Sequence, residues 1–581
     1  MSSAFIAVHD LPARWRNRHL FTFADTDFGD GARFLSLLRC WRADDARCDR
    51  LHYIAIAGLT PPCDELAAIW PMRVPGVHRI ELDAGRVVLT LAIGDEDMLS
   101  RLWARVDAFH VGACADPKRI AKTMARFAAD HATVSADVSL EGALRASGFE
   151  SVSTDNDRLV ARFAPRWRVR RHEPPIAHEV KTREAIVIGA GLAGCAVTST
   201  LAERGWKITL IDRHNAPARD ASGNPAGVFH PIVWRDDSIA ARLTRAGFLL
   251  ALDRWQALER AGHDLKRSRS GLLQIADTND DAEALAQAIA RFDYPREYVT
   301  PVSSDEAARI AGVHVTRGGW FFPRGGAISP AAICAAQLAQ SGDALTTRMN
   351  TQISRIAYDG TRWQVFDTSD VLIAQAPVLV LANAHEAQRL AHLHGEPTRS
   401  VRGQLSLLDT SALDGLRVPV IGEGYALPLS AQRTLIGATY DIDDPDREIR
   451  DAGHIENIER LANMLPDVAR ERAASFEGRV AFRCVTSDRM PMIGQLADES
   501  LARRDAAKLS GAWPLDLPRA PGLYGAFAFG SRGLVWATLA AELIASQIEG
   551  APWPIERELA EAIDPARFLL RALRHGEITA S

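Results

Sequence analysis

The sequence predicts an α/β protein of several domains, and three observations lead to this class. The chain has 581 residues, which is more than one hydrophobic core usually serves and suggests about three to four domains. Strand-like and helix-like stretches alternate along it, as in parallel sheets covered by helices. A glycine turn between such a strand and helix, within residues 185–212, is typical of a Rossmann-type dinucleotide-binding domain.

The part of the chain before residue 165 predicts one α/β unit. Apolar stretches at 51–59, 86–95 and 106–113 are expected strands, and a helix is expected at 117–130. This alternation is typical of a parallel sheet.

A change in composition at 165–182, which is rich in Arg, Pro and His, predicts a linker. Its arginines Arg166, Arg168, Arg170 and Arg171 form the clearest basic patch in a chain of net charge −5. A local patch of this kind attracts polyanions. A solvated linker without a partner explains it equally well.

The segment 185–212 contains a complete strand, turn, helix and strand. Gly189 permits the tight turn, Gly191 lets the backbone approach a diphosphate, and Gly194 lets the helix pack closely on the strand. The N-terminus of the helix then faces the phosphates with unpaired N–H groups. Asp212, 18 residues after Gly194, is placed to accept hydrogen bonds from a ribose.

Later segments favour a flavin over a nicotinamide. In 221–229 the small residues Ser222, Gly223 and Asn224 let backbone amides approach a cofactor. In 529–534 a strand passes into an apolar helix, so that Gly530, Ser531, Arg532 and Gly533 bring a second helix N-terminus toward the flavin ring. Each segment alone is also consistent with an ordinary strand-to-helix turn. Further strands are expected at 361–367, 376–383, 434–441 and 522–530, and helices at 281–292 and 454–465.

Composition limits the class of protein. The chain is 47% hydrophobic and 24% charged, which is ordinary for a soluble domain. Its seven cysteines include no CxxC pair, so we expect neither a disulfide framework nor a metal site, and a cytoplasmic location. No signal peptide core and no apolar stretch long enough for a membrane span are seen, so no membrane association is expected.

Residues 183–550 resemble the FAD-dependent amine oxidase family that includes glycine oxidase, sarcosine oxidase and D-amino acid oxidase. The resemblance is closest to the oxidoreductase half of the bifunctional bacterial proteins of tRNA 5-methylaminomethyl-2-thiouridine biosynthesis. The segments that carry it are 221–227, 318–330, 401–407, 424–441, 478–494 and 529–534.

The resemblance implies FAD as cofactor and tRNA as partner. Members of this family remove the carboxymethyl group from carboxymethylaminomethyl-uridine at the wobble position. A hydride passes to the flavin, the imine is hydrolysed to release glyoxylate, and O2 is the expected electron acceptor. A guanidinium suits the substrate carboxylate because its planar fork pairs with both oxygens. The resembling segments contain five arginines, namely Arg324, Arg402, Arg483, Arg489 and Arg532, and the sequence does not say which of them points into the pocket. The candidates chosen are Arg324, Arg402 and Arg489.

Residues 11–163 resemble the S-adenosylmethionine-dependent methyltransferase domain of the same bifunctional family, but with departures. Segment 23–35 stands at the place of the glycine-rich loop, with Gly29 and Gly31 kept. At the end of the second strand, Ala57 and Gly58 replace the acidic residue that would hold the ribose. At the catalytic strand, the segment 112–114 (Gly-Ala-Cys) replaces Asp-Gly-Phe. We therefore hypothesise that methyl transfer is weakened or lost, and binding of S-adenosylmethionine is in doubt.

The expected fold is thus an N-terminal Rossmann-like methyltransferase-type domain, followed by a two-domain FAD-dependent oxidoreductase. The latter has a Rossmann-type FAD domain and an α+β substrate domain. The boundaries expected are 1–164 for the degenerate methyltransferase-like domain, 165–182 for the linker, 183–270, 371–400 and 520–550 for the FAD domain, 271–370 and 401–519 for the substrate domain, and 551–581 for a tail. Two other functions remain open: an FAD-dependent oxidase of a small secondary amine or amino acid, and a non-catalytic tRNA-binding flavoprotein.

Overall fold

The computed structural model describes residues 2–95, 97–155, 158–393, 398–409, 413–430, 433–467, 476–509 and 511–576. The chain separates into two compact units. We call Met1–Glu179 with Ala545–Glu561 the first unit, and Val180–Ile544 with Ala562–Ser581 the second unit. The stretch that the sequence assigned to a tail, 551–581, is therefore divided between them.

The first unit is built on one eight-stranded sheet in the order β3-β4-β2-β1-β5-β6-β8-β7. The neighbours β4, β2, β1, β5 and β6 are parallel, whereas β3, β8 and β7 pair antiparallel. The parallel strands are buried nearly throughout, as expected for a sheet covered by helices on both faces. The strands are β1 (Leu20–Asp25), β2 (Arg50–Ala57), β3 (Gly76–Leu82), β4 (Val87–Ile93), β5 (Val106–His110), β6 (Ala128–Asp137), β7 (Phe149–Asp155) and β8 (Arg158–Phe163).

The helices of the first unit include one whose N-terminus is capped by an acidic side chain. Helix α5 (Pro117–Phe127) begins after Asp116, whose carboxylate accepts the N–H groups of Lys118 and Arg119. The expected helix 117–130 was too long, because Ala128 pairs with Val106 as the first residue of β6. The other helices are α1 (Ser2–Val8), α2 (Ala32–Ala43), α3 (Asp64–Ala67), α4 (Met98–Arg101) and α6 (Glu141–Ala146).

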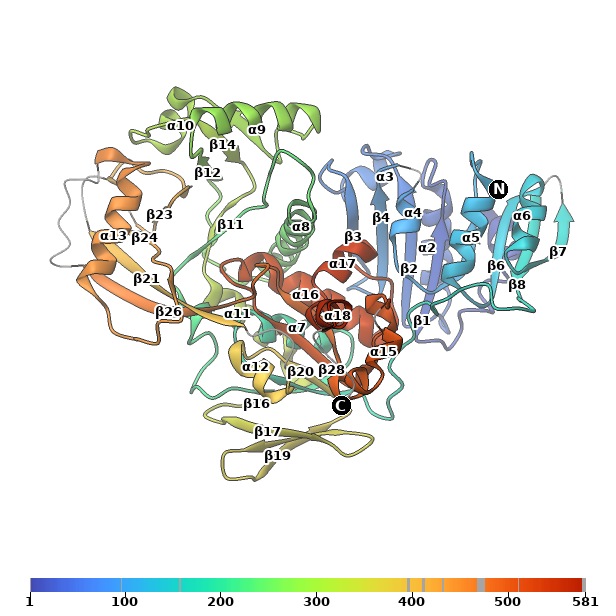
Figure 1. Cartoon of the computed structure of the whole chain (residues 1–581). Coiled ribbons are helices and arrows are strands. Elements are labelled where there is room, and N and C mark those ends of the chain that lie inside the picture. Colours follow the sequence, from blue (N-terminus) through green and yellow to red (C-terminus); the bar gives the residue numbers. More distant parts are fainter. Residues whose placement is uncertain are drawn as a thin grey trace. The chain divides into compact units, whose positions relative to one another are not determined.

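The second unit contains the predicted dinucleotide-binding sheet, in the order β16-β10-β9-β20-β28-β27. Only β27 runs antiparallel. Helix α7 (Leu192–Glu203) follows β9. Helix α16 (Gly533–Glu549) follows β28 (Figure 1), and its residues from Ala545 on belong to the first unit. The strands are β9 (Glu184–Ile188), β10 (Lys207–Ile211), β16 (Leu345–Arg348), β20 (Val378–Leu381), β27 (Met492–Ala497) and β28 (Arg519–Phe527). A separate antiparallel sheet joins β17 (Ile353–Tyr358), β18 (Trp363–Asp367) and β19 (Leu372–Ala376).

A mixed nine-stranded sheet forms the other part of the second unit. Its order is β13-β14-β12-β22-β23-β24-β21-β25, and β26 also pairs with β21. Helices α9, α10 and α13 lie against this sheet (Figure 1). The strands are β12 (Leu272–Ile275), β13 (Thr300–Val302), β14 (Gly319–Phe322), β21 (Arg399–Asp409), β22 (Val420–Ile421), β23 (Tyr425–Pro428), β24 (Arg433–Gly437), β25 (Asp441–Ile442) and β26 (Glu477–Val485).

The remaining elements complete the second unit. Strand β11 (Gly227–Phe229) pairs with β15 (Gly326–Ile328). The expected helices 281–292 and 454–465 correspond to α9 (Asn279–Arg291) and α13 (Asp451–Ala462), which confirms both. The other helices are α8 (Ile239–Arg260), α10 (Ser304–Ala311), α11 (Pro330–Ser341), α12 (His385–Leu390), α14 (Glu499–Arg504), α15 (Ala506–Leu509), α17 (Arg557–Ala562), which spans the division between the units, and α18 (Arg567–Arg574). Within the described ranges, no helix combines the length and hydropathy needed to cross a bilayer.

Candidate cofactor and substrate site

The glycine turn after β9 leaves no room for side chains. Gly189 has a φ of +105°, and a Cβ there would lie 2.6 Å from the carbonyl oxygen of Ala382. A Cβ on Gly194 would lie 1.8 Å from the carbonyl oxygen of Gly189. The turn therefore keeps bare backbone at the N-terminus of α7, which is the geometry that a bound diphosphate needs.

Asp212 lies directly after β10 and contacts the same turn. Its Oδ2 accepts the N–H of Ala190 at 2.7 Å, and its Oδ1 accepts the N–H of His214 at 2.8 Å. An ionised carboxylate offers about four lone-pair sites. Both oxygens can therefore accept a further hydrogen bond, as the predicted ribose contact requires.

The segment 221–224 packs beside the glycine turn. The Oγ of Ser222 accepts the N–H of Leu192 at 3.0 Å, and a Cβ on Gly191 would lie 2.9 Å from that oxygen. Gly223 is equally confined, since its Cβ would lie 2.5 Å from the carbonyl oxygen of Ala218. The Oδ1 of Asn224 instead accepts the Nε–H of Arg479 at 3.1 Å. The segment thus lies against the glycine turn, but the Asn224 side chain is used within the protein.

The turn at 529–533 brings a second helix N-terminus to the first. Gly530 has a φ of +55°, and its N–H donates to the carbonyl of Cys484 at 2.9 Å. Gly533 begins α16, and a Cβ there would lie 3.4 Å from Cδ1 of Leu192, the first residue of α7. The N-termini of α7 and α16 therefore lie together, and both favour negative charge.

A guanidinium and a neutral imidazole lie at this turn. Burial lowers the pKa of Arg532 to about 10, and its Nη1 donates to the carbonyl of His230 at 3.5 Å. Burial, and then the charge of Arg532, lower the pKa of His230 to about 3. His230 is thus uncharged at neutral pH. Among the described residues no carboxylate lies within 4 Å of the Arg532 guanidinium, so its charge is available to an anion.

Two of the three arginine candidates lie at exposed turns. Arg324 is exposed between β14 and β15. Arg489 is exposed between β26 and β27, with a φ of +59°. Exposed arginines are poorly placed to exclude water from a substrate carboxylate, because the surrounding solvent screens their charge. Ser531, in the turn before α16, is exposed as well.

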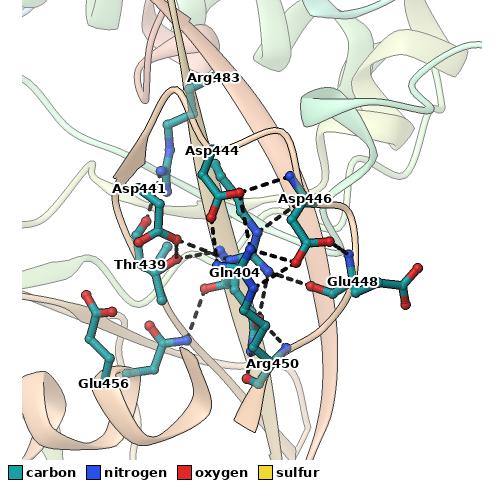
Figure 2. A network of polar contacts seen from close by, with 12 residues as sticks. Gln404, Thr439, Asp441, Asp444, Asp446, Glu448, Arg450, Glu456 and Arg483 are labelled. Carbon is teal, nitrogen blue, oxygen red and sulfur yellow. Dashed lines mark hydrogen bonds and ion pairs between the residues drawn. The ribbon is translucent and has the colours of Figure 1, made fainter. Parts of the chain in front are cut away.

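The third candidate, Arg402 on β21, is only 1% exposed and bonds within the protein. Its Nε donates to the carbonyl of Asp446 at 2.9 Å, and Nη2 donates to the carbonyl of Glu448 at 2.5 Å. Nη1 pairs with Asp441 at 3.2 Å. Figure 2 shows the surrounding network, in which Arg450 also bonds Asp444 and Asp446. A role for Arg402 at the substrate stays a prediction that would require these contacts to be exchanged.

We expect Arg402→Leu to destabilise the substrate domain. The change removes the donor of the partly buried Asp446 and Glu448 carbonyls and one of the partners of the Asp441 carboxylate, and loss of hydrogen bonds to a charged group typically costs about 2 kcal/mol. Thermal unfolding of the purified variant should begin several degrees below that of the wild type. Arg355→Gln, on the exposed edge pair with Asp370, is the matched control and should unfold like the wild type. Equal unfolding of both variants would contradict the prediction.

Arg483 on β26 is half-buried, whereas Arg324 and Arg489 are exposed and Arg402 is fully used within the protein. Its Nη1 donates to the carbonyl of Thr439 at 3.1 Å, and burial lowers its pKa. A Cβ on Gly403, on the neighbouring strand, would lie 2.6 Å from that Nη1, so the glycine makes room for the guanidinium. Two tyrosines flank it: Tyr425, whose pKa burial raises to about 12, and Tyr440 at 5.8 Å. In Figure 2 the Arg483 side chain points toward Thr439 and Asp441.

Arg483 is also tied to the cofactor turn by the chain itself. The next residue, Cys484, accepts the N–H of Gly530. The sequence placed Arg483 in a resembling segment without preferring it. The signal that singles it out is Gly403, which lies diagonally across from it on the paired strand, and this placement depends on a strand register which the sequence does not state.

At the carboxyl edge of the first unit's sheet, an acidic side chain is bonded within the unit itself. Asp25, at the end of β1, accepts from Arg33 Nε at 2.9 Å and from the hydroxyl of Tyr53 at 2.6 Å. A Cβ on Gly112 would lie 2.4 Å from Cβ of Asp27, so Asp27 lies directly against the Gly112 backbone. Strand β2 ends at Ala57, without a carboxylate for a ribose. The part of the chain that the structure describes contains no group of three or more His, Cys, Asp or Glu able to hold a metal ion.

Comparison with known proteins defines the class first. The model of the family described as FAD dependent oxidoreductase matches residues 184–547. Glycine oxidase from Geobacillus kaustophilus shares the fold, with a TM-score of 0.54 and 21% identity over 66% of this chain and 99% of that one. Iminodiacetate oxidase from Chelativorans sp. BNC1 has a TM-score of 0.52 and 23% identity, over 66% and 98%. The second unit is therefore an FAD-dependent oxidoreductase.

Whole-chain relatives define the family more narrowly. A protein from Paraburkholderia phytofirmans is 54% identical over 99% of this chain and 94% of its own length. One from Burkholderia thailandensis is 49% identical over the same shares. Both are named tRNA 5-methylaminomethyl-2-thiouridine biosynthesis bifunctional protein MnmC. The chain belongs to this family of bifunctional proteins, which confirms the resemblance found in its sequence.

Proposed function

We propose that the chain oxidatively removes the carboxymethyl group of carboxymethylaminomethyl-(2-thio)uridine at the wobble position of tRNA. The products are aminomethyl-uridine and glyoxylate. The observation that supports this most directly is the intact glycine cradle in a chain that shares 54% identity, over 99% of its length, with a relative named for this modification. The reaction uses no metal and needs no protein nucleophile.

The residues of the second unit fit FAD. The bare backbone at Gly189, Gly191 and Gly194 and the N-terminus of α7 would hold the diphosphate, and Asp212 would accept from the ribose. The N-terminus of α16 at Gly533 would face the flavin ring. Bound FAD supplies the hydride acceptor, and we propose O2 as the final electron acceptor.

The protein's own contribution is to position the substrate. The carbon between the amine and the carboxylate loses a hydride, water adds to the resulting imine, and the C–N bond breaks to release glyoxylate. Arg483 would pair with the carboxylate in a half-buried site, which fixes the reacting carbon and neutralises the charge next to it. Arg532, with the neutral His230 beside it, would add positive charge at the flavin side.

We also propose that methyl transfer by the first unit is weakened or lost. The support is the missing ribose carboxylate at the end of β2 and the use of Asp25 by Arg33 and Tyr53. A purified chain that methylates aminomethyl-uridine tRNA at an ordinary rate would overturn this part alone.

Analysis of wobble nucleosides tests the proposed function. In a strain that lacks this chain, mass spectrometry of digested tRNA should show accumulated carboxymethylaminomethyl-uridine, because that base is then no longer oxidised. Return of the gene should remove it. Accumulated aminomethyl-uridine would instead mean that methylation is the step lost, and unchanged nucleosides would contradict the proposal.

A small secondary amine or amino acid is the second candidate substrate, and the acidic net charge of −5 favours it. Phosphate contacts release counterions, so tRNA binding should weaken steeply with salt. Anaerobic bleaching of the flavin by modified tRNA, but not by sarcosine or glycine, would decide for tRNA.

A further inference from the structure

The arginine-rich stretch after Pro165 is not a free tether but one wall of a cavity in the first unit. Arg170 donates to the carbonyls of Ala125 and Ala128 at 3.0 and 2.7 Å, and its guanidinium lies 5.2 Å from the ring centre of Phe163. Arg168 donates to the carbonyls of Arg170 and Arg171. These bonds hold the stretch against α5 and β8.

The cavity has a volume of about 450 Å³, which is within the range of small-molecule sites. Its lining contains no Asp or Glu. Six cations line it, from α5, the arginine-rich stretch and α17: Lys122, Arg126, Arg168, Arg170, Arg171 and Arg557. Three of the four arginines of the basic patch are therefore concentrated around one hollow.

Carboxylates near the cavity offset only part of this charge. Glu173 pairs with Arg170 and Glu561 pairs with Arg557. Among the residues that the structure describes, no carboxylate lies within 4 Å of the cationic nitrogens of Lys122, Arg126 or Arg168. Burial, and then the charge of Arg557, lower the pKa of Arg126, which shows that like charges are crowded here.

Two tryptophans line the same cavity in different ways. Trp103 is 5% exposed and packs under the Arg557 guanidinium at 5.7 Å. Trp167 is 55% exposed, although burial of an indole ring is favourable. An exposed aromatic face among cations is the combination that holds single-stranded nucleic acid, with the ring stacking on a base and the cations contacting phosphates.

We propose that this cavity is a tRNA-docking site, in which Lys122, Arg126 and Arg168 contact backbone phosphates and Trp167 stacks on an unpaired base. The proposal rests on the proposed function, because it takes tRNA as the substrate. It gives the first unit a task that does not need methyl transfer, namely to bind the macromolecule whose base is oxidised in the second unit.

Binding measurements on the full-length, FAD-loaded chain test the proposal. The probe is tRNA that carries the carboxymethylaminomethyl base, isolated from a strain that lacks the chain. For the double variant Lys122→Gln/Arg168→Gln, we expect the Kd at moderate salt to rise by roughly tenfold or more. The slope of log K against log salt should become shallower by about 1.4 to 1.8, which corresponds to two lost phosphate contacts. Trp167→Ala should raise Kd roughly tenfold with the slope unchanged, because stacking is not ionic.

Controls separate this proposal from the proposed function. Arg39→Gln removes an exposed charge of the same unit that does not line the cavity, and it should bind like the wild type. The docking variants should raise KM for tRNA and keep kcat at saturating tRNA, with normal flavin content.

If the wild type binds and oxidises tRNA and the double variant matches it, the docking site is wrong and the function stands. If the wild type neither binds nor oxidises tRNA, both fail. Equal losses for heparin and tRNA, with KM for tRNA unchanged, would show a general polyanion patch and overturn the proposal.

Discussion

Arg483→Ala is expected to lower kcat/KM for the carboxymethylaminomethyl substrate by roughly 100-fold or more. The reason is that a half-buried carboxylate would lose its only proposed charged partner, and truncation of one member of such a pair typically costs about 3 kcal/mol. Steady-state kinetics and the rate of anaerobic flavin bleaching both measure it. Flavin content should be unchanged, because the Arg483 guanidinium bonds the Thr439 carbonyl and lies beside two tyrosines, and its bond does not go to the glycine cradle.

Two comparisons show whether Arg483 acts on the carboxylate or only on the fold. Arg483→Lys keeps the charge but not the planar fork, so it should recover part of the lost activity. A substrate analogue with an amide in place of the carboxylate should be oxidised equally slowly by wild type and Arg483→Ala, because the interaction is then absent from both. If the variant loses as much on the amide as on the acid, Arg483 has a structural role. Arg355→Gln serves as the surface control.

The cofactor half of the site was predictable because its determinants are local in the sequence. Gly189, Gly191 and Gly194 lie within one strand-turn-helix unit, so their spacing alone implies the turn. The second helix N-terminus at Gly533 was also recognisable from an apolar strand and helix separated by small residues. The two helix N-termini lie together at Leu192 and Gly533. This follows because parallel strands of this class end at the same edge of the sheet.

The substrate half was not predictable in the same way, because long-range register decides it. Arg402 and Arg483 lie on paired strands, β21 and β26, far apart in the sequence. Nothing local indicates that the carbonyls of Asp446 and Glu448 receive the Arg402 guanidinium, or that Gly403 opens space for Arg483. The same applies to residues 545–561, which belong to the first unit although they follow the last strand of the second.

The basic patch shows how tertiary contacts decide whether a stretch is a free tether or part of a folded unit. From composition alone, the stretch after Pro165 suited a solvated linker as well as a polyanion site. Backbone carbonyls at the end of α5 accept hydrogen bonds from Arg170 and hold it in place. The residues next to Arg170 then line a cavity together with Lys122 and Arg126. The positive charge around the cavity therefore comes from α5 and α17 as well as from the patch.

Gly191→Val is expected to give a folded protein without flavin. The backbone of Gly191 is extended, with φ −84° and ψ −170°, and a β-branched residue adopts that conformation without strain. Its Cβ, however, would lie 2.9 Å from Ser222 Oγ, and its methyl groups would stand where the diphosphate approaches the N-terminus of α7. The purified variant should lack visible flavin absorbance and should not regain it with added FAD.

Unfolding measurements distinguish this loss from a general defect. FAD that binds only the native state raises the unfolding temperature of the wild type, and it should leave that of Gly191→Val unchanged. Far-UV circular dichroism of the variant should match that of the wild-type apoprotein. Gly142→Ala, where a Cβ meets nothing within 4 Å, should keep full flavin. By contrast, Gly194→Ala places its Cβ 1.8 Å from a backbone oxygen and should unfold the domain itself. A yellow Gly191→Val protein with one FAD per chain would mean that the diphosphate binds elsewhere.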